Sequence, residues 1–269
     1  MVLSDRAIVY LHGFPGGPSE LQLFGRPPAA LNGTFAPDRA NDRPDLDAVA
    51  YADDLAGRVQ AYADNRPVHL IGFSLGARTA LELAGRIGPE VAQIDLISPA
   101  GPLDGSDHIN AMAGRAIFSM AAARPKLFRL HSAMQGWFAR RCPGLLYRAL
   151  FADGSESMAR NAEFRRTMEG ILKQCFANGS AGYRREILAY VGPWSSLPTR
   201  VKTPTIIWQG GRDSWTPPIM SERLATLLPN AERHLLPELG HYGALQHALH
   251  AICDQRQLQI PRSPHDHSR

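Results

Sequence analysis

Residues 68–76 constrain the fold of this chain more than any other stretch. An apolar run leads into the pattern Gly72-x-Ser74-x-Gly76, and small and apolar residues at helical spacing follow it. Glycines on both sides of one serine indicate a tight turn from a strand into a helix, because only a residue without a Cβ fits where the backbone segments come that close. We therefore predict a strand–turn–helix unit whose serine hydroxyl is pushed out of the fold. A glycine-rich turn that merely contains a serine is the alternative.

The rest of the chain alternates predicted strands with predicted helices. Strands are predicted at 7–11, 33–36, 67–71, 91–98, 205–209 and 232–236. Helices are predicted at 19–31, 45–63, 77–87, 219–228 and 241–257. Such alternation favours a mostly parallel sheet with helices on both faces. We expect an α/β fold with about six strands, followed by a disordered polar tail at 261–269.

The region 102–202 interrupts this alternation. It contains no strand-like run, and its apolar residues recur at helical spacing, which predicts four or five helices. We expect two units: an α/β core at 1–101 and 203–269, and a helical insertion at 102–202 above the ends of the strands. The methionines and aromatic residues of the insertion are interpreted as packing residues, some of which line a pocket. One apolar series at helical spacing is Leu127, Leu130, Met134 and Trp137.

Composition excludes several classes of protein. The chain is 44% hydrophobic and 20% charged, as in an ordinary globular protein. No apolar run approaches the roughly 18 residues of a membrane-spanning helix, so no integral membrane segment is expected. No signal peptide is visible at the start of the sequence. Three widely spaced cysteines indicate reduced thiols, and we expect a cytoplasmic protein.

Charge is distributed unevenly along the chain. The whole chain has a net charge of +4, whereas residues 102–200 contain 14 Lys and Arg against 7 Asp and Glu. We interpret this basic region as a solvated helical surface, with attraction to anionic substrates or acidic lipid headgroups as the alternative. No nucleic-acid-binding motif accompanies the charge, so no nucleic-acid partner is expected.

Three side chains suited to nucleophilic catalysis follow three different predicted strands: Ser74, Asp213 and His241. The carboxyl ends of parallel strands meet at one edge of a sheet, so we expect these side chains to lie together. A serine hydroxyl is a weak nucleophile that needs a neighbouring base, which histidine supplies, and a carboxylate holds the imidazole in the correct tautomer. The sequence therefore predicts a Ser–His–Asp catalytic triad.

Other residues fit these roles less well. Asp213 could instead cap a turn, and Asp95 lies inside a strand. The competing histidines lie in a strand or on the last helix, away from any turn: His234, His247 and His250. The sequence has no clustered Cys/His pattern and no GxGxxG motif, so neither a metal nor a cofactor is expected.

With its Ser, Asp, His order, the chain resembles the α/β-hydrolase superfamily. The resemblance covers almost the whole chain and rests on His12-Gly13, Gly72–Gly76, Gly210–Asp213 and Gly240-His241. It also includes an insertion where many members carry a helical cap. The resemblance implies an α/β-hydrolase fold in which Ser74 is the nucleophile, His241 the base and Asp213 its partner. It further implies an oxyanion hole made by the backbone N–H groups of Phe14 and Leu75. His12 is expected to be structural or to line the wall of the site, without a chemical role.

The resemblance implies a hydrolase that acts on a small-molecule acyl substrate. We expect cleavage of a carboxylic ester or thioester through an acyl-enzyme. A carbon–carbon bond hydrolase or lyase with the same triad is the first alternative, and a non-catalytic binding protein on this fold is the second. About six residues precede the strand at 7–11, where many members have an antiparallel hairpin. Either the sheet is trimmed, which leaves an edge that a second copy of the chain could cover as a homodimer, or the start of the protein lies upstream.

Overall fold

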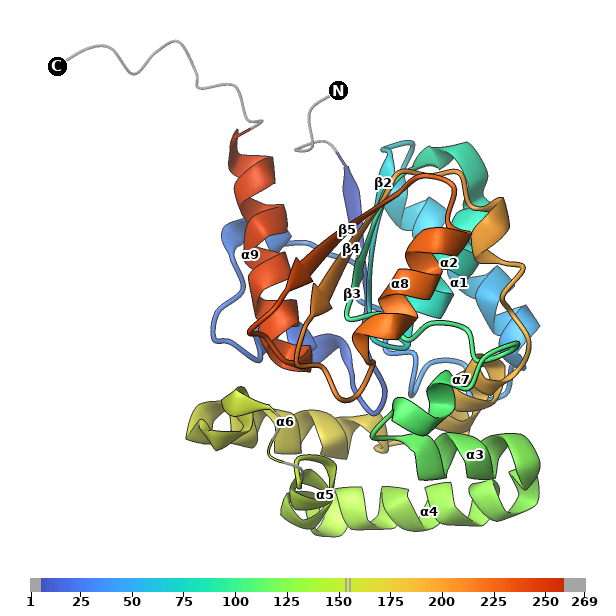
Figure 1. Ribbon diagram of the computed structural model, residues 1–269, viewed down its shortest axis with the longest axis vertical. Coiled ribbons are helices and arrows are strands. Elements are labelled where there is room, and N and C mark those ends of the chain that lie inside the picture. Colours follow the sequence, from blue (N-terminus) through green and yellow to red (C-terminus); the bar gives the residue numbers. More distant parts are fainter. Residues whose placement is uncertain (1–5, 153, 155, 259–269) are drawn as a thin grey trace, which may run out of the picture.

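One parallel sheet organises the molecule (Figure 1). The computed structural model describes residues 6–152, 154 and 156–258, so the expected tail at 261–269 lies outside the described residues. The sheet has five strands in the order β1-β2-β3-β4-β5. Their bounds are Ala7–Leu11 (β1), Val68–Phe73 (β2), Val91–Ile97 (β3), Thr205–Gly210 (β4) and Ala231–Leu236 (β5). The chain therefore has the predicted α/β architecture, with a sheet close to the expected size.

Two elements predicted near the N-terminus differ from the structure. The expected strand at 33–36 is reduced to a single bridge between Val9 and Phe35, because Gly33 and Pro37 flank it and Pro37 has no N–H to donate to a ladder. The expected helix at 19–31 is broken into two short 3-10 turns, Pro18–Gln22 and Ala29–Leu31. A glycine and two prolines between these turns prevent a continuous helix.

Both faces of the sheet are covered, because β1 and β2 are buried at every position although successive side chains point to opposite faces. The helices α1 (Ala48–Ala63) and α2 (Gly76–Ile87) pack on one face, where Val9, Leu70 and Leu96 point. The helix α9 (His241–Leu258) packs on the other face, against Ile71 and Trp208. The helix α8 (Pro218–Leu227) contacts β4 and β5.

Five α-helices lie between β3 and β4 in the chain, within the described residues. They are α3 (Arg115–Ala123), α4 (Pro125–Arg141), α5 (Pro143–Leu150), α6 (Ala162–Cys175) and α7 (Ala181–Val191). Figure 1 shows them together across the carboxyl ends of the strands. Proline occupies the first position of α4 and α5, and the Asn161 side chain accepts two backbone N–H groups at the start of α6. The separation of these helices from the core as a cap stays a prediction.

The predicted packing role of one apolar series in α4 is wrong, although its Met134 lines a cavity, as expected for some residues of the insertion. Leu127, Leu130, Met134 and Trp137 expose 44%, 69%, 51% and 51% of their surface. The helix packs through the opposite stripe instead, whose members are Phe128, Ser132, Gln135 and Ala139. In Figure 1, α4 is the helix of the insertion that lies farthest from the sheet, so only one of its sides has a neighbour. No helix of the described ranges has the length and apolar character to span a bilayer.

Candidate active site

Ser74 lies at the tight turn between β2 and α2. Its φ of +54° is in the left-handed region, which costs a residue with a Cβ on the order of 1–3 kcal/mol. The surroundings hold it there: Ser74 N–H donates to the Ile97 carbonyl at 3.0 Å, and its carbonyl accepts from Ala100 N–H at 3.1 Å. A Cβ on Gly76 would collide with the Leu11 carbonyl oxygen. The glycine requirement predicted at this turn is therefore confirmed by the packing.

Asp213 and His241 form a buried pair beyond β4 and β5. Asp213 Oδ2 lies 2.7 Å from His241 Nδ1, and both side chains are almost fully buried. The other carboxylate oxygen accepts the backbone N–H groups of Trp215 and Thr216, each at 2.9 Å. The Thr216 hydroxyl lies 2.9 Å from Oδ2. Four polar groups therefore fix the position of this carboxylate.

The partners of His241 determine what its ring can do. Because Asp213 occupies Nδ1 with a carboxylate oxygen, the proton belongs on Nδ1 and Nε2 is left as an acceptor. The ring of His241 stacks on Trp215, with centroids 5.6 Å apart and planes 14° apart. The Phe73 ring contacts it from another side, with centroids 4.6 Å apart. A neutral histidine held in this tautomer is equipped to accept a proton.

The structure brings Ser74 to the same edge of the sheet as the Asp213–His241 pair. Phe73, which touches His241, directly precedes Ser74 in the chain. A single cavity is lined both by Ser74 and by Trp215 and Thr216, which contact the pair. The three residues predicted from sequence thus lie around one site.

The loop after β1 and the turn after β2 each present a backbone N–H group next to Ser74. Phe14 and Leu75 are buried and line the same cavity as Ser74. Within the described part of the chain, no hydrogen bond uses the N–H of either residue. A Cβ on Gly13 would lie 3.1 Å from the Ser74 Cβ, so the loop passes directly against the serine. Two N–H groups without partners beside a serine can stabilise a developing oxyanion.

Glu20 supports this loop from beneath, a contact that the sequence did not predict. Its side chain is buried, and Oε2 accepts the Tyr10 hydroxyl at 2.8 Å and the Gly13 N–H at 3.0 Å. Burial raises the pKa of Glu20 to about 7 despite these hydrogen bonds and the nearby Arg39. No sequence signal marks Glu20, because a glutamate in a loop is ordinarily solvated.

His12 and Arg39 complete the support of the loop. His12 is fully buried, Nδ1 donates to the Gly13 carbonyl at 2.7 Å, and Nε2 accepts the Arg39 N–H at 3.2 Å. Burial and the Arg39 charge lower the pKa of His12, which keeps it neutral. The Arg39 guanidinium donates to the His12 carbonyl, lies 4.8 Å from the Phe14 ring centre and pairs with Glu186 of α7. The structural role expected for His12 agrees with these contacts.

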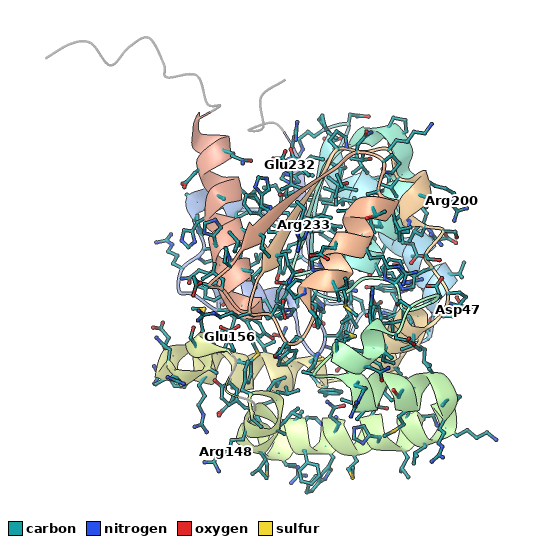
Figure 2. All side chains as sticks on the ribbon, viewed as in Figure 1. Asp47, Arg148, Glu156, Arg200, Glu232 and Arg233 are labelled. Carbon is teal, nitrogen blue, oxygen red and sulfur yellow. The ribbon has the colours of Figure 1, made fainter. Side chains whose placement is uncertain are left out.

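Glu156 connects the inserted helices to the start of α9. Its Oε2 accepts the Tyr242 N–H at 2.8 Å, next to His241, and its side chain is buried. Figure 2 shows Glu156 between α6 and the lower end of α9. A carboxylate is stabilised at a helix N-terminus, where free N–H groups point outward. The position of His241 therefore depends in part on a residue from the insertion.

The cavity beside Ser74 has a volume of about 840 Å³ and extends under α3, α4 and α5. Its walls are mostly aliphatic and aromatic, and among the described residues no Asp, Glu, Lys or Arg lines it. Gln135 is buried in one wall, and its Oε1 has no hydrogen-bond partner among the described residues. The described residues contain no group of three His, Cys, Asp or Glu side chains placed to hold a metal ion.

Comparisons with known proteins agree with this architecture. The sequence profile of the "Alpha/beta hydrolase family" matches residues 8–255. No curated protein sequence matches the chain. The solved structure of MenH from S. aureus is 15% identical, covers 96% of both chains and superposes with a TM-score of 0.66.

Two further solved structures share the fold. A thermophilic esterase from Thermogutta terrifontis is 20% identical, with 95% of this chain and 91% of that chain covered and a TM-score of 0.64. A bromoperoxidase from Bacillus anthracis is 16% identical, with 94% and 90% covered and a TM-score of 0.62. At these identities the likeness concerns the fold, which unrelated activities share.

Proposed function

This chain belongs to the alpha/beta hydrolase family, and from that premise we propose that it is a serine hydrolase acting on a carboxylic ester or thioester. The observation that carries the proposal is the Asp213–His241 pair beside the cavity that contains Ser74. A serine, a histidine and an aspartate around one cavity supply the nucleophile, the base and the orienting carboxylate that the chemistry requires.

The first half of the reaction forms an acyl-enzyme. His241 Nε2 takes the proton of the Ser74 hydroxyl while Ser74 Oγ attacks the acyl carbon, which gives a tetrahedral intermediate with a negative oxygen. The N–H groups of Phe14 and Leu75 donate to that oxygen. When the intermediate collapses, the bond to the leaving alcohol or thiol breaks, and His241 returns the proton to the leaving group. Asp213 stabilises the imidazolium between these two steps.

The second half releases the acid. A water molecule gives its proton to His241 Nε2 and attacks the acyl carbon through a second tetrahedral intermediate. The bond to Ser74 Oγ then breaks, and His241 reprotonates the serine. Removing one oxyanion donor typically costs on the order of 3 kcal/mol of transition-state stabilisation, so the conformation of the loop at Phe14 is decisive for the rate.

The cavity supports an apolar, uncharged acyl group as the bound part of the substrate. A charged acyl group would lose its hydration with only His131 as a wall residue able to become cationic among the described ones, because no Asp, Glu, Lys or Arg lines the cavity. A volume of about 840 Å³ fits a medium-sized ligand. We infer that residues 102–202 act as a cap on the core at 1–101 and 203–269, since α3, α4 and α5 form the far wall.

Substitution of Ser74 tests the proposal. We expect Ser74→Ala to reduce hydrolysis of a p-nitrophenyl ester by at least ~10⁴-fold and to abolish labelling by a fluorophosphonate probe. Ser98→Ala is the matched control, because Ser98 also follows a strand at positive φ and is buried, but does not line the cavity. Hydrolysis that persists in folded Ser74→Ala protein would refute the role of Ser74. Turnover of a vinylogous diketone in preference to esters would identify a carbon–carbon bond hydrolase instead.

A further inference from the structure

The outer face of α4 and the start of α5 concentrates exposed apolar side chains. Of the ten large apolar side chains exposed among the described residues, six lie here. We call this surface the α4–α5 face; its apolar members are Leu127, Leu130, Met134, Trp137, Phe138 and Leu145. Their exposed fractions of 38% to 69% leave a cluster of large apolar side chains open to solvent. Clusters of this size on one face are typical of an interaction site.

The spacing along α4 shows that the exposure is organised. Leu127, Leu130, Met134 and Trp137 follow one another by three, four and three residues, which places them on one stripe of a helix. The opposite stripe, which includes Phe128 and Ala139, is fully buried against the rest of the insertion. The stripe of α4 with more large apolar side chains is therefore the one that does not pack against the rest of the insertion.

The same stretch of chain carries only positive charge. Residues 108–152 contain seven Lys and Arg and no Asp or Glu. All seven are exposed, and among described residues none of them forms an ion pair. Helical spacing places Lys126 and Arg141 on the apolar stripe, with Arg129 and Arg140 along one border. Arg140 also donates to the Phe176 carbonyl at 2.7 Å. Figure 2 shows Arg148 beside α5, on the side of the molecule away from the sheet.

The chemistry of this face matches an anionic lipid surface. An apolar helix face bordered by Lys and Arg and containing Trp is the composition of helices that lie in the plane of a membrane interface. Long basic side chains can extend their charged ends to phosphates while their stems cover apolar surface. A second copy of the chain is a poorer occupant, because two such faces would bring like charges together without acidic partners.

The α4–α5 face and the cavity share residues. Met134, Phe138 and Leu145 are members of the α4–α5 face and also line the cavity that contains Ser74. We propose that the α4–α5 face docks on anionic lipid bilayers, with its apolar side chains in the headgroup–acyl boundary and its Lys and Arg on lipid phosphates. Substrate entry from the lipid phase follows from this docking and rests on the proposed function, whereas the docking itself does not.

Vesicle binding tests the docking directly. We expect the protein to co-sediment with phosphatidylcholine vesicles that contain phosphatidylglycerol at least ~10-fold more tightly than with phosphatidylcholine alone, and to be released by high salt. Trp137 fluorescence should shift to the blue on binding, and the Trp137→Phe variant should lose that shift. Binding to neither vesicle, or equal binding to both, overturns the proposal.

Charge variants show whether this face is the one that binds. The Lys126→Gln/Arg141→Gln variant should bind anionic vesicles about 30-fold more weakly. The matched control is Arg200→Gln/Lys202→Gln, which removes the same charge from exposed positions beyond α7, the last of the inserted helices. Figure 2 shows Arg200 far from Arg148. Equal weakening by both variants would mean that net charge, rather than this face, determines binding, and would overturn the proposal.

Apolar variants and the inactive enzyme complete the test. Leu130→Gln/Trp137→Gln should weaken vesicle binding at least ~10-fold, whereas Ile219→Gln, 44% exposed on α8, should not. A dimer in light scattering that disappears in the Leu130→Gln/Trp137→Gln variant would assign the face to a second copy and overturn the proposal. Ser74→Ala should bind vesicles like the wild type. If the wild type hydrolyses esters but does not bind vesicles, only the docking is refuted. If the wild type binds vesicles but is inactive, only the proposed function is refuted.

Discussion

Within the described residues, two buried His–Asp pairs have similarly short contacts but lie in different parts of the sheet. His241 Nδ1 lies 2.7 Å from Asp213 Oδ2, and His69 Nε2 lies 2.6 Å from Asp95 Oδ2. All four side chains are nearly inaccessible to solvent. The first pair follows the carboxyl ends of β4 and β5, whereas the second lies within β2 and β3. A close, buried His–Asp contact is therefore not sufficient to make an active site.

The two pairs differ in where they lie in the sheet and in what surrounds them. The other oxygen of Asp95 accepts the Trp208 indole N–H at 2.7 Å, and its Oδ2 also accepts the Gln93 amide at 3.0 Å. This cluster is enclosed between the sheet and α9, and none of its residues lines the cavity. The His241 ring instead contacts Trp215, which lines the cavity together with Ser74, the proposed nucleophile. We therefore expect the His69–Asp95 pair to stabilise the fold and the His241–Asp213 pair to serve catalysis.

Replacing each aspartate by asparagine is expected to give the largest effect and tests most directly whether the two pairs differ in function. We expect Asp213→Asn to lower kcat for a p-nitrophenyl ester by about 10⁴-fold, because an amide does not hold the imidazole in the reactive tautomer. Asp95→Asn should leave kcat within a few-fold of the wild type. Steady-state kinetics of the two folded variants decide the matter, and similar losses in both would erase the distinction.

The free energy of unfolding of the same two variants should change in the opposite order, with the larger loss at Asp95. Asp95→Asn leaves a buried histidine without its carboxylate in the middle of the sheet, which should cost about 3 kcal/mol of unfolding free energy. Asp213→Asn should cost less, because the oxygen of the substituted amide can still accept the Trp215 and Thr216 N–H groups. Urea denaturation monitored by circular dichroism measures both values. A larger loss at Asp213 would contradict the structural assignment of the Asp95 pair.

The pH dependence of stability extends the comparison to a third buried carboxyl group, that of Glu20. Its pKa rises from an ordinary value of 4.5 to about 7 on folding, so the folded state binds more protons than the unfolded state between these values. Stability from this group is present below pH 4.5 and is lost as the pH rises to about 7. Glu20→Gln should remove that loss. The free energy of unfolding of the variant, measured by urea denaturation, should therefore rise relative to that of the wild type between about pH 5 and pH 8. Glu90→Gln, an exposed control, should show a constant difference.

Thr216 gives the smallest expected effect and probes the surroundings of Asp213. Thr216→Val keeps the shape of the side chain but removes the hydroxyl that lies 2.9 Å from Asp213 Oδ2. Loss of one hydrogen bond to a charged group costs about 1.5 kcal/mol, so kcat should fall about 10-fold with little change in KM. The control Thr226→Val removes an exposed hydroxyl on α8 that bonds only the Glu222 carbonyl. A fall of the same size in both variants would point to a general loss of stability.

Much of the site could be predicted from the sequence, because its parts are encoded locally. The serine turn depends on Gly72 and Gly76, and the positions of Asp213 and His241 follow from the ends of apolar runs. Strand ends, tight turns and the order of elements are specified by residues close together in the chain. Parallel pairing then brings the carboxyl ends of those strands to one edge.

Only the tertiary structure showed what supports and surrounds the site. Glu20, Arg39 and Glu156 act on residues up to 147 positions away, through buried contacts that no local pattern records. The more apolar stripe of α4 is the exposed one, so the packing of the insertion, and not the apolar pattern, decided which side is buried. Local sequence thus determined the elements of the candidate site, whereas long-range packing decided which charges are buried and which apolar face meets the outside.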